Sequence, residues 1–234
     1  MLPKYFWYAL GEIILVVIGI LIAIQINAWY QGVLDRKEEI EILEDIQSEY
    51  ESNRALLTSI INGRQELADD WADFIRNLTQ DRSSARHRFQ ENLSFGAIRF
   101  YPSNGVMNTL IATGSIDLIR NDSLKHSLLN WNESLLGYFE DEALHVDFAN
   151  NQLIPYEQNL VPTPFRLQEG FEYVFEDEKT IIQQTRRAYE DLKYRNILLR
   201  NHFWIQRNLG SAKTLKKRYD DIIGRIGREL QQSE

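Results

Sequence analysis

The sequence predicts an all-α fold in which an N-terminal transmembrane helix runs into a long amphipathic helix, packed in an extramembrane helical bundle. Three observations predict it. An apolar run spans residues 8 to 30, apolar residues recur every three or four positions from residue 43 to 78, and a similar pattern returns from residue 182 to 230. Spacings of three and four place side chains on one face of a helix.

The apolar run, YALGEIILVVIGILIAIQINAWY, has the length and flanks of a membrane anchor. A helix needs about 20 residues to cross ~30 Å of hydrocarbon. Aromatic residues border the run on both sides, where headgroups meet acyl chains. A secretory signal needs small residues before its cleavage site, whereas Ile26 precedes Ala28 here. We therefore expect residues 1–30 to be a tail and an uncleaved anchor; a cleaved signal and a buried soluble helix are the alternatives.

Three residues of the anchor are candidates for contact with another membrane helix. Glu12 lies close to the first interface, so its carboxylate either stays hydrated at headgroup level or pairs with a neighbouring helix. Gly19 and Ala23 form a small-residue notch that lets a second helix approach closely. The notch favours a homo-oligomer.

Residues 31–234 are expected to form one helical extramembrane domain, which begins with a long juxtamembrane helix over 31–80. Asn53 and Arg64 fall on the apolar seam of this helix. Either other parts of the chain satisfy these two polar side chains, or the seam forms an intermolecular coiled coil in which a polar position fixes register. The apolar seam positions are Leu43, Ile46, Tyr50, Leu57, Ile60, Leu67, Trp71, Phe74 and Leu78.

Central helices are expected over residues 103–150. Ser103 or Asn104 should cap a helix that ends at Gly114. Asp122 or Ser123 should cap another helix, which runs through Trp131 and Tyr138 towards residue 150.

A loop region that contains prolines, 151–178, is expected next. Alternating apolar residues between positions 165 and 175 predict a loop or a short hairpin there. The C-terminal helices, 179–232, should be separated or kinked at Gly210. Their expected apolar stripe comprises Ile182, Thr185, Tyr189, Leu192, Asn196, Leu199, Phe203, Leu215, Tyr219, Ile222, Ile226 and Leu230.

Charge is unevenly distributed along a chain whose net charge of −8 argues against nucleic-acid binding. Residues 38–51 hold seven carboxylates and no base, whereas residues 186–228 hold twelve basic residues against four acids. If the last helix runs antiparallel to the first, a basic cluster in it comes near the acidic segment 38–51. Alternatively, that cluster contacts anionic lipid or an acidic partner. Its members are Lys213, Lys216, Lys217 and Arg218.

Two segments carry a resemblance to a known family. The stretch from Tyr8 to Trp29 and a second one, LIATGSIDLIRNDSLKHSLLNW, from Leu110 to Trp131, resemble domain of unknown function 6090, an uncharacterised family of bacterial single-span membrane proteins. The similarity continues loosely to IGREL near the C-terminus. It implies a membrane-anchored helical protein and brings no catalytic motif.

The expected location is the bacterial inner membrane, with a single pass and a periplasmic C-terminal domain. Basic residues near the span almost balance, since Lys4 and the α-amine stand against Arg36 and Lys37. The basic leaders of the similar family, the short N-terminal tail and the absence of cysteine favour the periplasm.

Catalytic motifs are missing from the sequence, so we expect no enzyme and no cofactor. Glu142 and His145 form one Glu-x-x-His pair, but helical di-iron sites need two such pairs and two further carboxylates. A mononuclear metal site and a hydrogen-bonded histidine are the two interpretations of this pair.

Two classes of function fit these features of the sequence. The first is a structural or interaction protein of the envelope, whose partner is a second copy or another envelope membrane protein. The second is a periplasmic ligand-sensing domain that acts through a partner protein, with Trp131, Tyr138, Phe139 and Trp204 in its interior. A buried pocket with converging polar groups favours sensing, and an exposed apolar stripe along residues 43–78 favours assembly.

Overall fold

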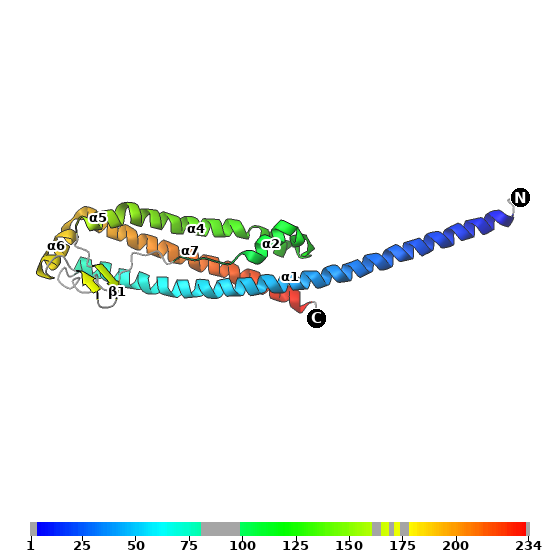
Figure 1. Ribbon diagram of the computed structural model, residues 1–234, viewed down its shortest axis with the longest axis horizontal. Coiled ribbons are helices and arrows are strands. Elements are labelled where there is room, and N and C mark those ends of the chain that lie inside the picture. The colour runs from blue at the N-terminus through cyan, green and yellow to red at the C-terminus, as the bar shows by residue number, and fades with distance from the viewer. Residues whose placement is uncertain (1–3, 81–98, 161–164, 169–170, 174–177, 233–234) are drawn as a thin grey trace. The chain divides into compact units, whose positions relative to one another are not determined.

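The computed structural model describes residues 4–80, 99–160, 165–168, 171–173 and 178–232. Helices dominate these residues, which confirms the predicted helical class with its long N-terminal helix (Figure 1). An antiparallel pair joins the strands β1 (Phe165–Gln168) and β2 (Phe171–Tyr173). The helices are α1 (Lys4–Gln80), α2 (Gly105–Thr113), the 3-10 helix η2 (Ser115–Leu118), α3 (Asp122–Leu129), α4 (Trp131–Phe148), the π-helix η3 (Ala149–Leu153), α5 (Ile154–Gln158), α6 (Glu178–Glu190) and α7 (Leu192–Gln231).

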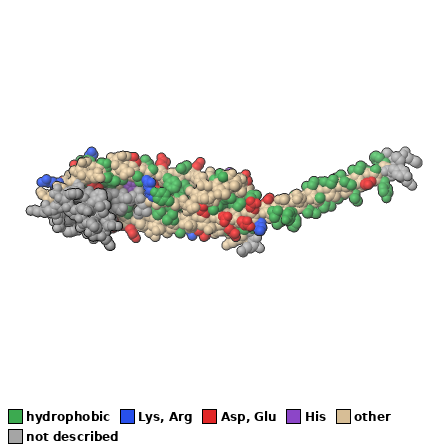
Figure 2. Space-filling model, viewed as in Figure 1, with side chains coloured by type: hydrophobic (Ala, Val, Ile, Leu, Met, Phe, Trp, Pro, Cys, Tyr) green, Lys and Arg blue, Asp and Glu red, His purple; other side chains and the backbone are tan. Residues whose placement is uncertain are grey.

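Helix α1 is continuous over its whole length (Figure 1). Its sequence contains no proline, so no missing backbone donor interrupts the hydrogen-bond ladder. Side chains from residue 6 to 31 are exposed, and Figure 2 shows hydrophobic side chains along this segment. Among the described helices, α1 alone contains a stretch long and apolar enough to cross a membrane.

The helices group into two compact units, and both α1 and α7 contribute residues to each. The first unit comprises Met1–Glu49, Asn104–Leu128 and Gly224–Glu234, and the second comprises Tyr50–Ser103 and Leu129–Ile223.

In the first unit, the buried carboxylate of Glu39 joins α1 to the segment before α3. Its Oε1 accepts a hydrogen bond from the backbone N–H of Arg120 at 2.7 Å. Its Oε2 lies 2.5 Å from a guanidinium nitrogen of Arg36 and 3.3 Å from one of Arg120. A carboxylate removed from water needs such charged and hydrogen-bonding partners, so Glu39 fixes the position of α1 within this unit.

Helix α2 has the expected boundaries but a different cap. It follows Asn104 and ends before Gly114, which adopts φ 77°. The Asn104 side chain makes no capping hydrogen bond; instead, Oε2 of Glu49 on α1 accepts the backbone N–H of Val106 at 3.0 Å. A carboxylate from another helix therefore supplies the negative charge that a helix N-terminus favours.

The predicted cap and extent of the next helix were wrong. Oδ1 of Asn121, rather than Asp122 or Ser123, accepts the backbone N–H of Leu124 at 3.0 Å. The helix also stops at Leu129, and a turn at Asn130 separates α3 from α4. Asparagine is as good a cap as aspartate or serine, so the sequence offered three adjacent candidates with nothing to rank them.

In the second unit, α1, α4 and α7 share a core. The rings of Tyr50, Trp131 and Tyr219, one from each helix, lie with centroids 4.4 to 5.4 Å apart. Arg54 on α1 forms an ion pair with Asp220 on α7, with 3.3 Å between a guanidinium nitrogen and a carboxylate oxygen. The α1 seam side chains buried in this unit are Tyr50, Leu57, Ile60, Trp71, Phe74 and Leu78.

Helix α7 does not break at Gly210, contrary to one predicted interpretation. It continues from Leu192 to Gln231, and the break lies at Asp191, between α6 and α7. Oδ1 of Asp191 accepts the backbone N–H of Tyr194 at 2.8 Å, which is the geometry of an N-cap. One glycine costs a helix only about 1 kcal/mol, which the packing of a long helix offsets.

The apolar stripe predicted for the start of α7 was also wrong. Leu192, Leu199 and Phe203 are exposed, and a different set of side chains is buried. This part of α7 is apolar on two faces, so spacing alone does not show which face packs inward. The buried set comprises Tyr194, Ile197, Leu198, Ile205 and Leu209.

A pair of glycine substitutions tests this assignment of helix ends and interiors. Gly114→Ala should destabilise the protein by about 1 kcal/mol, because a side chain disfavours positive φ. Gly210→Ala should stabilise it by roughly 0.4–1 kcal/mol, since the position is helical and an added Cβ meets nothing within 4 Å. Denaturant unfolding of the full chain measures both, and equal signs for the two changes would contradict the assignment.

Candidate functional site

A cluster of buried polar side chains crosses the core of the second unit. Arg64 on α1 is 4% exposed and forms an ion pair with Glu142 on α4, which is 5% exposed. Arg64 also donates to the backbone carbonyl of Asn208 on α7 at 3.1 Å. The guanidinium therefore ties three helices together at one level of the core.

The same carboxylate receives further donors. Oε1 of Glu142 accepts the hydroxyl of Tyr138 at 2.5 Å and the backbone N–H of Phe100 at 3.3 Å. Arg64 lies over the Tyr138 ring, 5.6 Å from its centroid. Burial, together with the neighbouring Glu142, raises the pKa of Tyr138 despite the opposing charge of Arg64, so this phenol stays a hydrogen-bond donor at neutral pH.

One turn further along α4, His145 contacts two amides of α7. Its Nε2 lies 3.0 Å from Oδ1 of Asn201, and its Nδ1 lies 3.0 Å from Nδ2 of Asn208. A carboxamide oxygen only accepts and a carboxamide nitrogen only donates, so the ring is neutral with its proton on Nε2. Burial lowers the pKa of His145, in agreement with this pattern.

These contacts give the Glu-x-x-His pair a structural role. Glu142 uses its Oε1 to pair with Arg64, and both ring nitrogens of His145 contact amides, so the imidazole has no free lone pair for a metal. Within the described ranges, no group of three or more His, Asp or Glu side chains is placed to hold a metal ion.

Asn53, the other polar residue of the seam, is also satisfied within the second unit. Its Nδ2 donates to the carbonyl of Ser103 at 2.6 Å, and its Oδ1 accepts the N–H of the same residue at 2.9 Å. Asn53 and Arg64 thus meet partners in their own chain. The seam is buried rather than presented as an exposed stripe for an intermolecular coiled coil.

The three candidates in the anchor are exposed on α1. Glu12, Gly19 and Ala23 are separated by seven and four residues, so they share one helix face. A Cβ added at Gly19 meets nothing within 4 Å. This face is therefore open to a neighbouring helix.

The described partners of the basic cluster lie within the second unit. Lys213 donates to Gln65 at 2.8 Å, Lys216 pairs with Asp220 at 2.9 Å, and Arg218 donates to Ser134. Lys217 is exposed. Two carboxylates of the acidic segment have partners within the first unit: Glu39 forms an ion pair with Arg36, and Glu49 accepts the backbone N–H of Val106.

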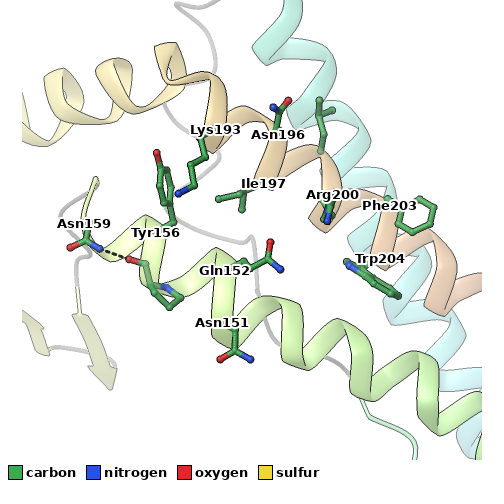
Figure 3. Close-up of a pocket in the computed structure, with 12 residues that line it drawn as sticks. Asn151, Gln152, Tyr156, Asn159, Lys193, Asn196, Ile197, Arg200, Phe203 and Trp204 are labelled. Atoms are coloured by element: carbon green, nitrogen blue, oxygen red, sulfur yellow. Dashed lines mark hydrogen bonds between the residues drawn. The ribbon is translucent and has the colours of Figure 1, made fainter.

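An open groove of about 1030 Å³ lies between the η3–α5 segment and the first half of α7 (Figure 3). Tyr156 and Lys193 lie at one end, with the ammonium 4.5 Å from the ring centroid. Phe203 and Trp204 lie at the other end, and Arg200 lies near them. The complete lining is Asn151, Gln152, Pro155, Tyr156, Asn159, Lys193, Asn196, Ile197, Leu199, Arg200, Phe203 and Trp204.

Sequence reasoning missed most of these groove residues. Trp204 was expected in an apolar interior, and Leu199 and Phe203 were assigned to a buried stripe. The signal that was available is the second apolar face of α7, which carries Leu192, Leu199 and Phe203. Asn201 and Asn208, the partners of His145, were not predicted either, because single asparagines in a helix have many structural roles.

Removing one charge of the buried ion pair should cost more stability than removing both. Arg64→Leu leaves the Glu142 carboxylate buried without a countercharge, which costs roughly 3–5 kcal/mol. Adding Glu142→Gln removes that charge and keeps an acceptor for Phe100. Denaturant unfolding should therefore show the double variant to be more stable than Arg64→Leu alone; additive losses would contradict the proposed coupling.

Buried His145 and half-buried Glu157 should give opposite pH dependences of stability. Burial lowers the pKa of His145 in the folded protein below its ordinary value of 6.5, so the unfolded chain binds more protons and stability falls as the pH drops below about 6.5. Burial raises the pKa of Glu157 from 4.5 to about 7, so its contribution is lost as the pH rises through that range. Unfolding titrations of His145→Gln and Glu157→Gln between pH 5 and 8 should remove slopes of opposite sign.

A slope that is the same in the wild type and His145→Gln would show that this imidazole is not buried in its neutral form. Glu157→Gln is the matched control, because it changes a single group in the same unit without altering the His145 contacts.

Comparison with known proteins identifies the family. A family model described as a family of unknown function (DUF6090) matches residues 12–140, more than half of the 234 residues. The match begins at Glu12, covers α2 and α3 and ends within α4, two residues before Glu142. Searches of the curated proteins and of the solved structures gave no match. The expected resemblance is confirmed, and the chain belongs to the family of unknown function DUF6090.

Proposed function

We propose that this protein is a single-span membrane protein of the bacterial envelope that binds another protein through its extramembrane helices and catalyses no reaction. One observation carries the proposal. The apolar first third of α1 is exposed on all sides, while the following turns of the same helix are packed in a core.

Exposure of this segment to water would be very unfavourable. Ile13 is 61% exposed, Leu15 is 73% exposed and Trp29 is 71% exposed, and apolar side chains surround the helix between them. Soluble monomers rarely expose continuous apolar surfaces of this kind. Lipid covers such a surface at no cost, and a helix satisfies its own backbone groups in hydrocarbon.

Sequence features at the two ends of the segment support a permanent span over a cleaved signal. Phe6, Trp7 and Tyr8 precede it and Trp29 and Tyr30 follow it, as in the aromatic belts of membrane helices. We propose that the extramembrane helices lie in the periplasm; a chain without cysteine is compatible with an oxidising compartment. Glu12, Gly19 and Ala23 then form one face along which a neighbouring membrane helix docks.

Binding is the activity that the extramembrane helices support best. The buried side chains of Arg64, Glu142 and His145 are hydrogen-bonded to neighbouring groups of the second unit, as expected of groups that specify packing. The groove along α7, by contrast, presents exposed apolar and cationic side chains. A ligand-sensing role that signals through a partner is the second candidate, with the same groove as its binding site.

Labelling of a single cysteine tests the anchor and its orientation. The wild-type chain has no cysteine and serves as its own control. Ser59→Cys, at an exposed position of α1, should react with a membrane-impermeant maleimide in intact cells with a permeabilised outer membrane. Intact-mass measurement of the membrane fraction should show that residues 1–30 are retained.

Reaction of Ser59→Cys only after lysis of the inner membrane would place the domain in the cytoplasm. A mature mass without the first 30 residues, or a soluble full-length chain, would overturn the anchor.

A further inference from the structure

We infer that the groove between η3–α5 and α7 binds an extended acidic peptide segment of a partner protein. The inference rests on the proposed function as an interaction protein and adds the chemistry of the partner. Charge, spacing, hydrogen-bonding groups and shape support it in turn.

Charge complementarity is the first argument. The groove lining contains Lys193 and Arg200 but no carboxylate, although the whole chain carries a net charge of −8. Within the part of the chain that the structure describes, Arg200 has no hydrogen bond or ion pair. The nearby carboxylate of Asp191 accepts the backbone N–H of Tyr194 and the hydroxyl of Tyr156, and it also attracts the charge of Lys193. The groove therefore offers positive charge to a ligand.

The distance between the two cations matches the length of a short extended peptide. Lys193 and Arg200 lie seven residues apart on one helix, which corresponds to two turns, or about 10 Å. A peptide in the extended polyproline II conformation covers that distance in about one turn of three residues, at ~3.1 Å each. Two acidic side chains three positions apart then lie on the same face of the peptide and reach both cations.

Two side-chain amides of the groove match the hydrogen-bonding groups of a peptide backbone. Gln152 on η3 and Asn196 on α7 come from the two walls of the groove (Figure 3), and neither forms a side-chain hydrogen bond within the described residues. Each amide offers both donor and acceptor, which matches the N–H and C=O groups of an extended chain. Gln152 lies in a π-helical turn, a feature often found at functional sites.

The apolar end of the groove provides an anchor site. Leu199 is 49% exposed and Phe203 is 55% exposed, and they lie one helical turn apart beside Trp204. An apolar side chain of the peptide, placed next to the acidic residues, would cover these two. Such a buried apolar contact surrounded by polar ones is the usual arrangement of a binding hot spot.

Size and shape favour a peptide over a small metabolite. A volume of about 1030 Å³ is at the upper limit for small-molecule pockets, which typically enclose their ligand. This groove is open to solvent along its length. An extended segment can enter from the side and keep most of one face in water, as in other grooves that recognise peptides.

The test is a binding titration of the full chain in phosphatidylcholine nanodiscs. The probe is a fluorescein-labelled octapeptide library with glutamate fixed at two positions three residues apart and apolar or small polar residues elsewhere. A second library carries lysine at the fixed positions. Fluorescence anisotropy should rise with the acidic library and stay unchanged with the basic one.

Two matched double variants locate the binding site. Lys193→Gln with Arg200→Gln should weaken binding at least tenfold. Lys217→Gln with Arg228→Gln removes the same charges from exposed positions of the same helix, outside the groove, and should change affinity less than twofold. Phe203→Ser should weaken binding without changing its salt dependence, because it removes the apolar contact alone.

Several outcomes would overturn the inference. Equal losses in the two double variants would indicate non-specific electrostatic attraction, and no binding of the acidic library would exclude the site. Displacement of the peptide by glutarate at equal concentration would assign the groove to small organic anions. The titration does not depend on membrane topology, so its failure is distinguishable from failure of the proposed anchor.

Discussion

The ion pair between Arg64 and Glu142 is the constraint on which the packing of the second unit depends. A charge buried in an apolar seam must meet its partner, because leaving it alone costs several kcal/mol. Arg64 meets both Glu142 on α4 and a carbonyl on α7, so only one register of three helices satisfies it. Replacing such a pair by apolar residues is often neutral for stability. We therefore infer that the main role of the ion pair is to select this arrangement of the three helices.

A second polar layer extends this constraint along the same helices. His145 uses one ring nitrogen as donor and the other as acceptor towards two asparagines of α7. In the first unit Glu39 has a comparable role, since it binds Arg36 and Arg120. Each unit is thus specified by buried charge or amide groups in addition to apolar area. The apolar first third of α1 has no such partners among the described residues, which agrees with its proposed position in the membrane.

The sequence predicted the helical class, the continuous α1, the burial of its seam except at Leu67, and the end of α2 at Gly114, because these depend on local spacing and on glycine. It did not predict that Glu49 caps α2 and Asn121 caps α3. The first cap depends on a tertiary contact, and the second is one of three adjacent residues that cap a helix equally well. The stripe it predicted further along α7 was right, since Leu215, Tyr219, Ile222 and Ile226 are buried. The stripe it predicted at the start of α7 was wrong, because Leu199 and Phe203 repeat with the same period as the buried residues. Only packing distinguishes the two faces, and that error concealed the groove.

The central claim is that the seam of α1 is covered by helices of the same chain. Hydrogen exchange of the full chain in nanodiscs, followed by mass spectrometry over a range of protein concentrations, tests it most directly. The account predicts that amides of residues 57–74 exchange as slowly as those of residues 138–145 and 198–209, with protection that does not depend on concentration. Protection of 57–74 that appears only as the chain self-associates would contradict the account and assign the seam to an intermolecular coiled coil.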